Sequence, residues 1–288
     1  MEIIRAEKMG FCFGVEKAVE TCYDISKKTN GKKYILGMVV HNKDVVKDME
    51  KIGFEVVNED EILDGRDNLK KDDIVVIRAH GTTCEVIKRL KEKEVKIHDA
   101  TCVFVDRIKE ILIKREEVGD EIIFIGDKNH PEVKGVISFG KNVNVFKNLE
   151  ELKGSPLNVS KKYSVLTQTT LNKEKFLEIK EYLQKHYPNA QIFDRICGAT
   201  SERQDATKKL AKCTDVMIVI GDLNSSNSKK LLEVALACNP NSYLIQNENE
   251  LNLSIFNEKM SIGITAGAST PEEIIKKIEN KIRGNFNV

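Results

Sequence analysis

The sequence predicts an α/β protein made of three similar lobes with small, mainly parallel sheets, arranged as a pseudo-threefold trefoil. Short apolar runs rich in β-branched residues alternate with helix-like stretches along the chain, as in parallel sheets whose strands are connected by helices. One residue pattern also recurs three times, beginning at Cys12, Cys102 and Cys197, at intervals of roughly 90 residues. A chain of 288 residues can supply three lobes of that size.

The repeat defines the expected lobe boundaries. Lobe 1 is expected over residues 13–100, lobe 2 over 101–195 and lobe 3 over 196–284, with residues 1–12 as a candidate addition to lobe 3. The clear strand candidates are, in chain order, Lys33–Val40, Ile74–Ala79, Glu121–Gly126, Tyr163–Thr167, Val216–Gly221 and Ser261–Thr265. They are short and apolar on both faces, which is typical of buried parallel strands.

Apolar residues at three- and four-residue spacing predict helices between these strands. The three clearest stripes are Val15, Ala18, Val19, Cys22 and Ile25; Phe176, Ile179 and Leu183; and Leu231, Val234, Ala235 and Cys238. Two helix starts are expected from capping boxes. Thr270 and Glu273 form one before the last helix, and Ser201 and Gln204 form another just after Cys197.

Polar clusters follow the strand-like runs in every copy of the repeat. In chain order they are His41 with Asn42, His80 with Gly81, Asn129–Glu132, Thr169 with Thr170, Ser225–Ser228, and Ser269 with Thr270. Ligand-binding groups of parallel α/β sheets collect at the carboxyl ends of the strands. We therefore expect these clusters to line one pocket. The other two histidines, His98 and His186, lie outside the pattern and are expected to play ordinary structural or solvated roles.

The three cysteines that open the repeats are candidate metal ligands. Three thiolates suit zinc with a water or histidine as the fourth ligand, or a [4Fe–4S] cluster with one iron that has no protein ligand. They can also be packing residues of a duplicated fold. The other cysteines, Cys22, Cys84, Cys213 and Cys238, do not follow the repeat, and no CxxC motif occurs.

Two clusters carry further chemistry. Ser225–Ser228 and the Gly267–Ser269 segment each precede a helix, and hydroxyls with backbone N–H groups at a helix start suit a phosphate. Neither GxxxxGK[ST] nor GxGxxG is present, which argues against a nucleotide P-loop and a nicotinamide or flavin fold.

Glu132 is the carboxylate beside His130 and is a natural proton donor, with Thr169 as a hydroxyl that can pass the proton. Together these groups suggest reductive removal of a hydroxyl from a phosphorylated substrate.

Composition limits the class of protein. Hydrophobic residues make up 41% and charged residues 32%, and the net charge is +1, so neither nucleic acid nor an anionic membrane is an expected partner. No apolar stretch approaches membrane-spanning length, and residues 1–7 lack the apolar core of a signal peptide. A cytoplasmic location, where thiols stay reduced, is therefore expected.

Nine segments of the chain, in order, resemble one enzyme family, the 4-hydroxy-3-methylbut-2-enyl diphosphate reductases of the methylerythritol phosphate route of isoprene biosynthesis. They are Gly10–Val15, Val40–Asn42, Arg78–Gly81, Asp99–Cys102, Asn129–Val133, Thr167–Leu171, Cys197–Thr200, Asn224–Ser228 and Thr265–Ser269. Two positions depart from the family pattern, since Val103 replaces the usual proline after the second cysteine and Gly198 replaces a frequent tyrosine after the third. Neither departure removes a ligand or a donor.

The resemblance implies an oxidoreductase with three lobes around a central [4Fe–4S] cluster that Cys12, Cys102 and Cys197 would hold. It implies that the substrate hydroxyl binds at the unique iron, which has no cysteine ligand. Two electrons and two protons would then convert the substrate to isopentenyl and dimethylallyl diphosphate. Glu132 would supply protons, and Thr169 would contact the substrate hydroxyl. The implied diphosphate-binding residues are His41, His80, His130, Ser225, Ser226, Asn227 and Ser269. A ferredoxin or flavodoxin would donate the electrons.

Three rival interpretations remain open on the residues alone. Quinolinate synthase is another three-lobed enzyme with a three-cysteine cluster. A zinc hydrolase of phosphate esters would use the same cysteines for a different metal. A non-catalytic iron–sulfur sensor would use the cluster to regulate a partner.

Overall fold

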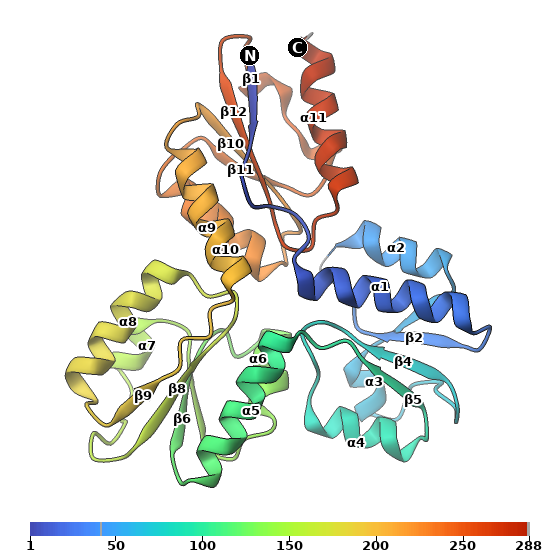
Figure 1. Cartoon of the computed structure of the whole chain (residues 1–288), viewed down its shortest axis with the longest axis vertical. Coiled ribbons are helices and arrows are strands. Elements are labelled where there is room, and N and C mark those ends of the chain that lie inside the picture. The colour runs from blue at the N-terminus through green and yellow to red at the C-terminus, as the bar shows by residue number, and fades with distance from the viewer. Residues whose placement is uncertain (41, 287–288) are drawn as a thin grey trace. The chain divides into compact units, whose positions relative to one another are not determined.

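The computed structural model describes residues 1–40 and 42–286 and contains three separate sheets, each of four parallel strands (Figure 1). Every pair of neighbouring strands is parallel. The expected α/β class with small parallel sheets is therefore confirmed. Among these residues, no helix is both long and apolar enough to cross a membrane.

The first sheet joins the N-terminal strand to the last third of the chain. Its strand order is β1-β12-β10-β11, formed by Glu2–Arg5, Ser261–Ala266, Val216–Ile220 and Ser242–Ile245. The associated helices are α9 (Gly198–Ala211), α10 (Ser226–Leu236) and α11 (Glu272–Phe286), with short 3₁₀ turns at Glu248–Glu250 and Leu253–Ile255. The isoleucines of α11 pack on one face of the sheet and form its core with β10 and β12.

The second sheet has the order β3-β2-β4-β5, formed by Phe54–Val57, Lys33–Leu36, Ile74–Ile77 and Lys96–Asp99. The accompanying helices are α1 (Phe13–Lys28), α2 (Lys43–Lys51), α3 (Glu59–Leu63) and α4 (Cys84–Glu92). The central strands β2 and β4 are buried along their whole length. The stripe predicted on α1 faces inward, and burial raises the pKa of Cys22 to about 12, as suits a packing cysteine.

The third sheet repeats this plan with the order β7-β6-β8-β9, formed by Val143–Phe146, Glu121–Ile125, Tyr163–Thr167 and Ala190–Ile192. Its helices are α5 (Val103–Glu117), α6 (Pro131–Ile137), α7 (Leu149–Lys153) and α8 (Lys173–His186). The predicted stripe Phe176, Ile179 and Leu183 on α8 is buried against this sheet. In all three sheets the two central strands are the most buried, and the cores lie between the sheets and the helices.

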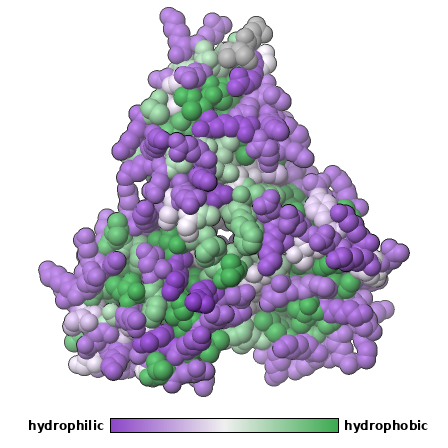
Figure 2. All heavy atoms as spheres, in the orientation of Figure 1, coloured by the Kyte–Doolittle hydropathy of each residue, from purple (hydrophilic) through white to green (hydrophobic). Residues whose placement is uncertain are grey.

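The chain forms two compact units. One comprises Met1–Glu16, Val40–Val45 and the chain from Gly198 onward, and the other comprises Lys17–Val39 and Val46–Cys197. The first sheet belongs to the first unit and the other two sheets belong to the second. Polar and charged side chains cover most of the face seen in Figure 2. The lobe boundaries and the trefoil arrangement expected from the repeat remain predictions.

Several expected element boundaries differ from the structure. Strand β2 ends at Leu36, four residues early, because Gly37 has a φ of +67° that turns the chain out of the sheet. The capping box at Ser201 and Gln204 is wrong, because α9 begins directly after Cys197 and both residues lie inside the helix. Helix α11 begins at Glu272, and the Thr270 hydroxyl donates to the buried carbonyl of Ile220 at 3.0 Å.

Candidate functional site

The polar clusters follow the carboxyl ends of the central strands in all three sheets. Strands β2, β6 and β10 lead to Asn42, to Asn129–Glu132 and to Ser225–Ser228, and strands β4, β8 and β12 lead to His80, Thr169 and Ser269. His41, the remaining predicted diphosphate ligand, lies outside the described residues. His80, His130, Glu132 and Thr169 belong to the second unit, whereas Ser225, Ser226, Asn227 and Ser269 belong to the first.

Glu132 and Thr169 form a buried hydrogen-bonded pair. Glu132 lies in the first turn of α6 and is 1% exposed. Its Oε1 accepts from the backbone N–H of Thr169 at 2.7 Å, and its Oε2 accepts from the Thr169 hydroxyl at 2.6 Å. Both carboxylate oxygens therefore contact the residue that follows β8, so the side chain is held in one orientation.

Burial raises the pKa of Glu132, against the opposing effect of the two hydrogen bonds from Thr169. The carboxyl group consequently keeps its proton to a higher pH than an exposed glutamate. A protonated carboxyl that is hydrogen-bonded to a hydroxyl is suited to deliver a proton through it. The pair thus has the chemistry of a general acid and its relay.

Two of the predicted histidines lie side by side. The rings of His80 and His130 are 5.5 Å apart between centroids, edge to face. His130 is also the N-cap of α6, where its Nδ1 accepts from the Glu132 backbone N–H at 3.2 Å. A nitrogen that accepts this bond carries no proton, so the proton of the neutral ring is on Nε2. Both rings are half-buried.

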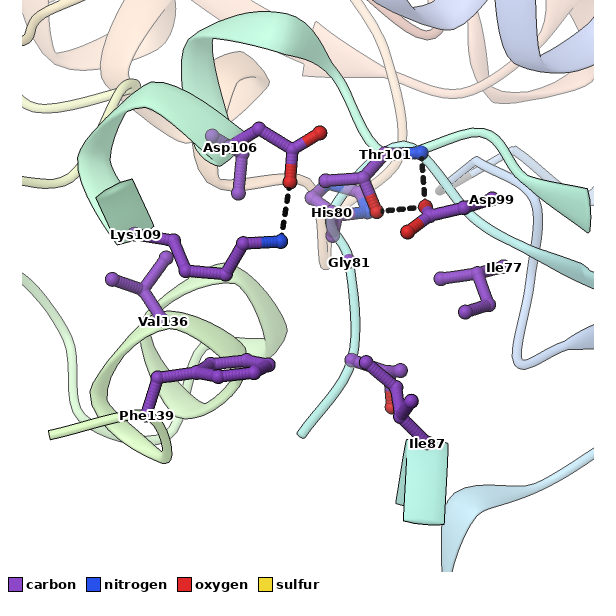
Figure 3. Close-up of a pocket in the computed structure, with 13 residues that line it drawn as sticks. Ile77, His80, Gly81, Ile87, Asp99, Thr101, Asp106, Lys109, Val136 and Phe139 are labelled. Atoms are coloured by element: carbon purple, nitrogen blue, oxygen red, sulfur yellow. Dashed lines mark hydrogen bonds and ion pairs between the residues drawn. The ribbon is translucent and has the colours of Figure 1, made fainter. Parts of the chain in front are cut away.

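His80 also lines a small pocket, which Figure 3 shows together with side chains from β4, β5, α5 and α6. Its volume is about 10 Å³, room for about one water molecule. The Thr101 hydroxyl donates to Asp99 at 2.5 Å, and Lys109 pairs with Asp106 at 2.5 Å (Figure 3). This space is too small to hold a diphosphate.

The first unit contributes a cradle of small polar residues at the start of α10. Ser225 is the N-cap, and its hydroxyl accepts from the Ser228 N–H at 3.3 Å. Asn227 is 6% exposed, yet neither its Oδ1 nor its Nδ2 has a hydrogen-bond partner. Buried amide groups are normally paired, so this side chain is positioned for a ligand. Ser269 is also buried, at the loop after β12.

Two glycines make room for this cradle. A Cβ placed at Gly221 or Gly267 would lie 2.1 or 2.2 Å from the Ser228 hydroxyl. The backbones after β10 and β12 therefore approach the first turn of α10 as closely as they do because these residues have no side chain. A helix N-terminus with free amide donors, hydroxyls and closely packed backbone is a binding geometry for phosphate.

The three repeat cysteines share one local geometry. Each directly precedes a helix, α1, α5 or α9, and each is half-buried and outside any disulfide. The backbone N–H of Cys12 donates to Ala268 O at 3.3 Å, that of Cys102 to Ala79 O at 2.9 Å, and that of Cys197 to Thr169 O at 3.0 Å. Each cysteine is thereby fixed to a strand-end loop of another repeat: Cys102 and Cys197 to the preceding repeat, and Cys12 to the third.

Those three loops carry predicted substrate-binding residues. Ala268 precedes Ser269, Ala79 precedes His80, and Thr169 is itself the partner of Glu132. Thr169 thus bonds to Cys197 through its carbonyl and to Glu132 through its amide and hydroxyl. The sequence gives no indication of these bonds, because they connect residues of different repeats.

The donor set fits a soft metal centre. Cysteine sulfur at a helix N-terminus, where the positive end of the dipole lies, can carry the negative charge that metal binding requires. The cysteines are divided between the two units, with Cys12 in the first and the others in the second. Within residues 1–40 and 42–286, no three His, Cys, Asp or Glu side chains are already gathered in metal-binding geometry.

The remaining cysteines have ordinary surroundings. Cys22 is buried on the apolar face of α1. Cys238, predicted on the apolar stripe of α10, lies in the turn after the end of that helix at Leu236 and is half-buried against the core. Cys84 and Cys213 are exposed, and their thiols donate to the carbonyls of Ser138 at 3.0 Å and Leu210 at 3.3 Å. None of the four precedes a helix from a loop that carries substrate-binding candidates.

One residue of the site region was missed by sequence reasoning. Arg203 of α9 is 6% exposed and donates to the carbonyls of Gly10 and Phe11, directly before Cys12. It stands between Glu202 and Gln204 in a polar stretch of the sequence, so no apolar stripe or motif distinguishes it from a surface arginine.

The chain is similar in sequence to known proteins along nearly its whole length. The family described as LytB protein matches residues 3–283. The 4-hydroxy-3-methylbut-2-enyl diphosphate reductase of Fusobacterium nucleatum subsp. nucleatum is 55% identical over all 288 residues, although the chain spans only 35% of that relative's length. The enzyme of the same name from Campylobacter hominis is 43% identical over 284 residues, which are 98% of each protein.

Solved structures match over nearly the whole chain. The structure of the E-1-hydroxy-2-methyl-but-2-enyl-4-diphosphate reductase from Plasmodium falciparum gives a TM-score of 0.92 at 29% identity, covering 99% of this chain and 89% of that one. A structure of (E)-4-hydroxy-3-methyl-but-2-enyl diphosphate reductase gives a TM-score of 0.70 at 35% identity, covering 99% and 100%. The resemblance noted in the nine sequence segments is confirmed. The chain therefore belongs to the LytB family, that of the 4-hydroxy-3-methylbut-2-enyl diphosphate reductases, and is an oxidoreductase.

Proposed function

We propose that this protein reduces 4-hydroxy-3-methylbut-2-enyl diphosphate to isopentenyl diphosphate and dimethylallyl diphosphate. In this reaction the substrate's C–O bond breaks, two electrons and two protons are consumed, and the hydroxyl leaves as water. The observation that best supports the proposal is that each repeat cysteine donates its N–H to a loop that carries a substrate-binding candidate. The three loops that fix the cysteines would then also contribute to substrate binding, through His80, Thr169 and Ser269.

The proposed cofactor is a [4Fe–4S] cluster with Cys12, Cys102 and Cys197 as its ligands. When bound, it would supply the electrons and a Lewis-acidic iron without a cysteine ligand. The three cysteines are half-buried, are not in disulfides and lie at helix starts, which suits anionic sulfur ligands. Zinc is the alternative for the same ligands, and it would not support electron transfer.

The diphosphate is assigned to residues that the family pattern implies. His80 and His130 would contribute ring donors, and Ser225, Ser226, Asn227 and Ser269 would contribute hydroxyl, amide and backbone donors. His41 completes the proposed set by the family pattern. The unpartnered amide of Asn227 supports this assignment, because a phosphate oxygen would satisfy a buried donor that is otherwise unpaired.

Proton delivery is assigned to Glu132 and Thr169. The raised pKa of Glu132 keeps the carboxyl protonated at higher pH, and the 2.6 Å bond leads from it to the Thr169 hydroxyl. Thr169 would pass the proton to the departing hydroxyl or to the allylic carbon. Reprotonation of Glu132 from solvent would complete the turnover.

The electron donor is proposed to be a ferredoxin or flavodoxin, since one-electron carriers match a cluster. We propose a cytoplasmic location on the basis of the cysteines, because free thiols suit a reducing compartment.

The deciding experiment is anaerobic purification of the full chain, followed by iron and sulfide analysis and turnover with a viologen as the reductant. We expect a brown protein with both elements present and two C5 diphosphate products. A colourless, zinc-loaded protein that hydrolyses phosphate esters would support the hydrolase instead. Condensation of dihydroxyacetone phosphate with iminoaspartate would support a quinolinate synthase. An iron–sulfur protein inactive in both assays would support the sensor.

A further inference from the structure

We propose that Arg203 is a positioning residue that fixes the arm carrying Cys12, so that its thiol is held in place for cofactor binding. The role in cofactor binding rests on the proposed function. The contacts that support it all lie within the first unit, and the test measures cysteine alkylation rather than turnover.

The arm is the segment Ala6–Cys12, which connects β1 to α1. One side of it is bonded to β12 and the loop that follows. The N–H groups of Ala6, Gly10 and Cys12 donate to Ile264, Ala266 and Ala268, at 2.8, 3.2 and 3.3 Å. Gly10 has a φ of +74°, a left-handed turn that favours glycine, and its carbonyl and that of Phe11 accept bonds from another element.

Arg203 supplies donors to these carbonyls. Its Nε and Nη2 donate to Gly10 O at 3.2 and 2.8 Å, and Nη2 also donates to Phe11 O at 2.9 Å. The other terminal nitrogen, Nη1, donates to Ala199 O at 2.8 Å in the first turn of α9. One rigid guanidinium therefore bonds to the residue before Cys12 and to the turn that begins after Cys197.

The helix that carries Arg203 is itself fixed to the same sheet. One turn further along α9, the Thr207 and Thr265 hydroxyls lie 2.9 Å apart, and both residues are fully buried. Near the end of α9, Lys209 pairs with Glu7 of the arm at 2.7 Å. The guanidinium thus extends from a fixed helix, so its position determines that of the arm.

The chemistry explains why arginine is required. Lysine has one ammonium on a flexible stem and cannot address three carbonyls from a single planar group. Arg203→Met would remove both the charge and the donors while keeping most of the apolar stem. Arg203→Lys would keep the charge and lose the planar fork. Arg115→Met is the matched control, because Arg115 is an ordinary structural arginine that bonds to Asp120 and Ser164 in the second unit.

The test measures alkylation of each cysteine by iodoacetamide in cluster-free, reduced full-length protein, resolved by peptide mass spectrometry, with Cys102 and exposed Cys84 as internal references. Arg203→Met should accelerate alkylation of Cys12 by roughly tenfold, the factor that corresponds to losing about 1.4 kcal/mol of constraint. Arg203→Lys should give an intermediate rate. Arg115→Met should lower the melting temperature without changing the rate at Cys12.

Iron content after anaerobic reconstitution provides the second measurement. It should fall in Arg203→Met and recover in part in Arg203→Lys. Unchanged alkylation of Cys12 in both Arg203 variants would overturn the proposal, as would equal acceleration at Cys102. If Arg203→Met fails to fold, Arg203→Lys decides alone, and a wild-type rate at Cys12 refutes the role. Failure of the proposed function would instead appear as wild-type protein that takes up no iron.

Discussion

Replacing Glu132 with glutamine should separate catalysis from stability. Glutamine has nearly the same shape, its Oε1 can still accept from the Thr169 N–H, and its amide can donate to the Thr169 hydroxyl. The two bonds of 2.7 and 2.6 Å therefore survive in altered form. What is lost is the transferable proton. Turnover should fall by at least ~100-fold, the contribution typical of a general acid, or about 2.7 kcal/mol in activation free energy.

Stability should respond to pH with a defined sign. Because burial raises the pKa of Glu132, the folded state favours its protonated form. The wild-type protein should have this contribution in full below the pKa of an unfolded glutamate, about 4.3, and lose it as pH rises through the folded pKa. The stability of Glu132→Gln relative to wild type should therefore increase with pH, by at most about 1.4 kcal/mol per pH unit.

The assay is urea unfolding followed by circular dichroism at several pH values, with anaerobic turnover measured in parallel. Asp120→Asn provides a control of opposite sign. Burial alone would raise the pKa of Asp120, but hydrogen bonds from Ser164 and Arg115 outweigh it and lower that pKa. The control should be destabilised by about 2 kcal/mol at neutral pH, with the loss shrinking as pH falls. The reasoning would be refuted if the stability of Glu132→Gln relative to wild type stayed constant or fell as pH rises, or if its turnover were near normal.

Three further predictions concern the cradle and the cysteines. Gly267→Ala should destabilise the protein by about 1–3 kcal/mol and be rescued by Ser228→Ala, because the clash is with the hydroxyl at 2.2 Å and the Cβ lies 3.4 Å away. Gly221→Ala should not be rescued by Ser228→Ala, because the Cβ of Ser228 is also close to this position, at 2.8 Å. Equal recovery of the melting temperature in the two double variants would contradict this. Asn227→Ala should raise KM about tenfold or more with little loss of melting temperature, because its amide has no protein partner to lose; an unchanged KM would exclude Asn227 from substrate binding. Serine at any of the three repeat cysteines should abolish or cripple iron binding, whereas Cys84→Ser should retain it; equal iron loss in both would require a different ligand set.

The central strands could be predicted because both of their faces are buried. Strands β4 and β10 are continuous apolar runs, and such runs stand out from the charged helices on either side. The edge strands β1, β5, β7 and β9 are half-exposed and mix polar with apolar residues, so in the sequence they resemble loops. Their pairing depends on the neighbouring strand rather than on their own composition.

The candidate site residues could be predicted because they recur in the three copies of the repeat. Histidines, serines and cysteines that recur at matching positions form a pattern that a single copy would lack. The bonds between them were not visible, because Cys12 pairs with Ala268 and Cys197 with Thr169 only after the sheets have formed. Arg203 illustrates the limit most clearly, since a buried arginine that bonds to backbone carbonyls has no partner that a sequence pattern can identify.

The carbonyl of Thr169 has a consequence for how the enzyme would fail. That single peptide group holds the amide of Cys197, while the same residue orients the carboxyl of Glu132. If Cys197 holds the proposed cluster, oxidation that released it would free the Thr169 carbonyl and also disturb Glu132. Electron transfer and proton transfer would then be lost together. Under the proposed mechanism, damage at the third cysteine would therefore disable both functions, unlike the Glu132→Gln change, which removes only the proton.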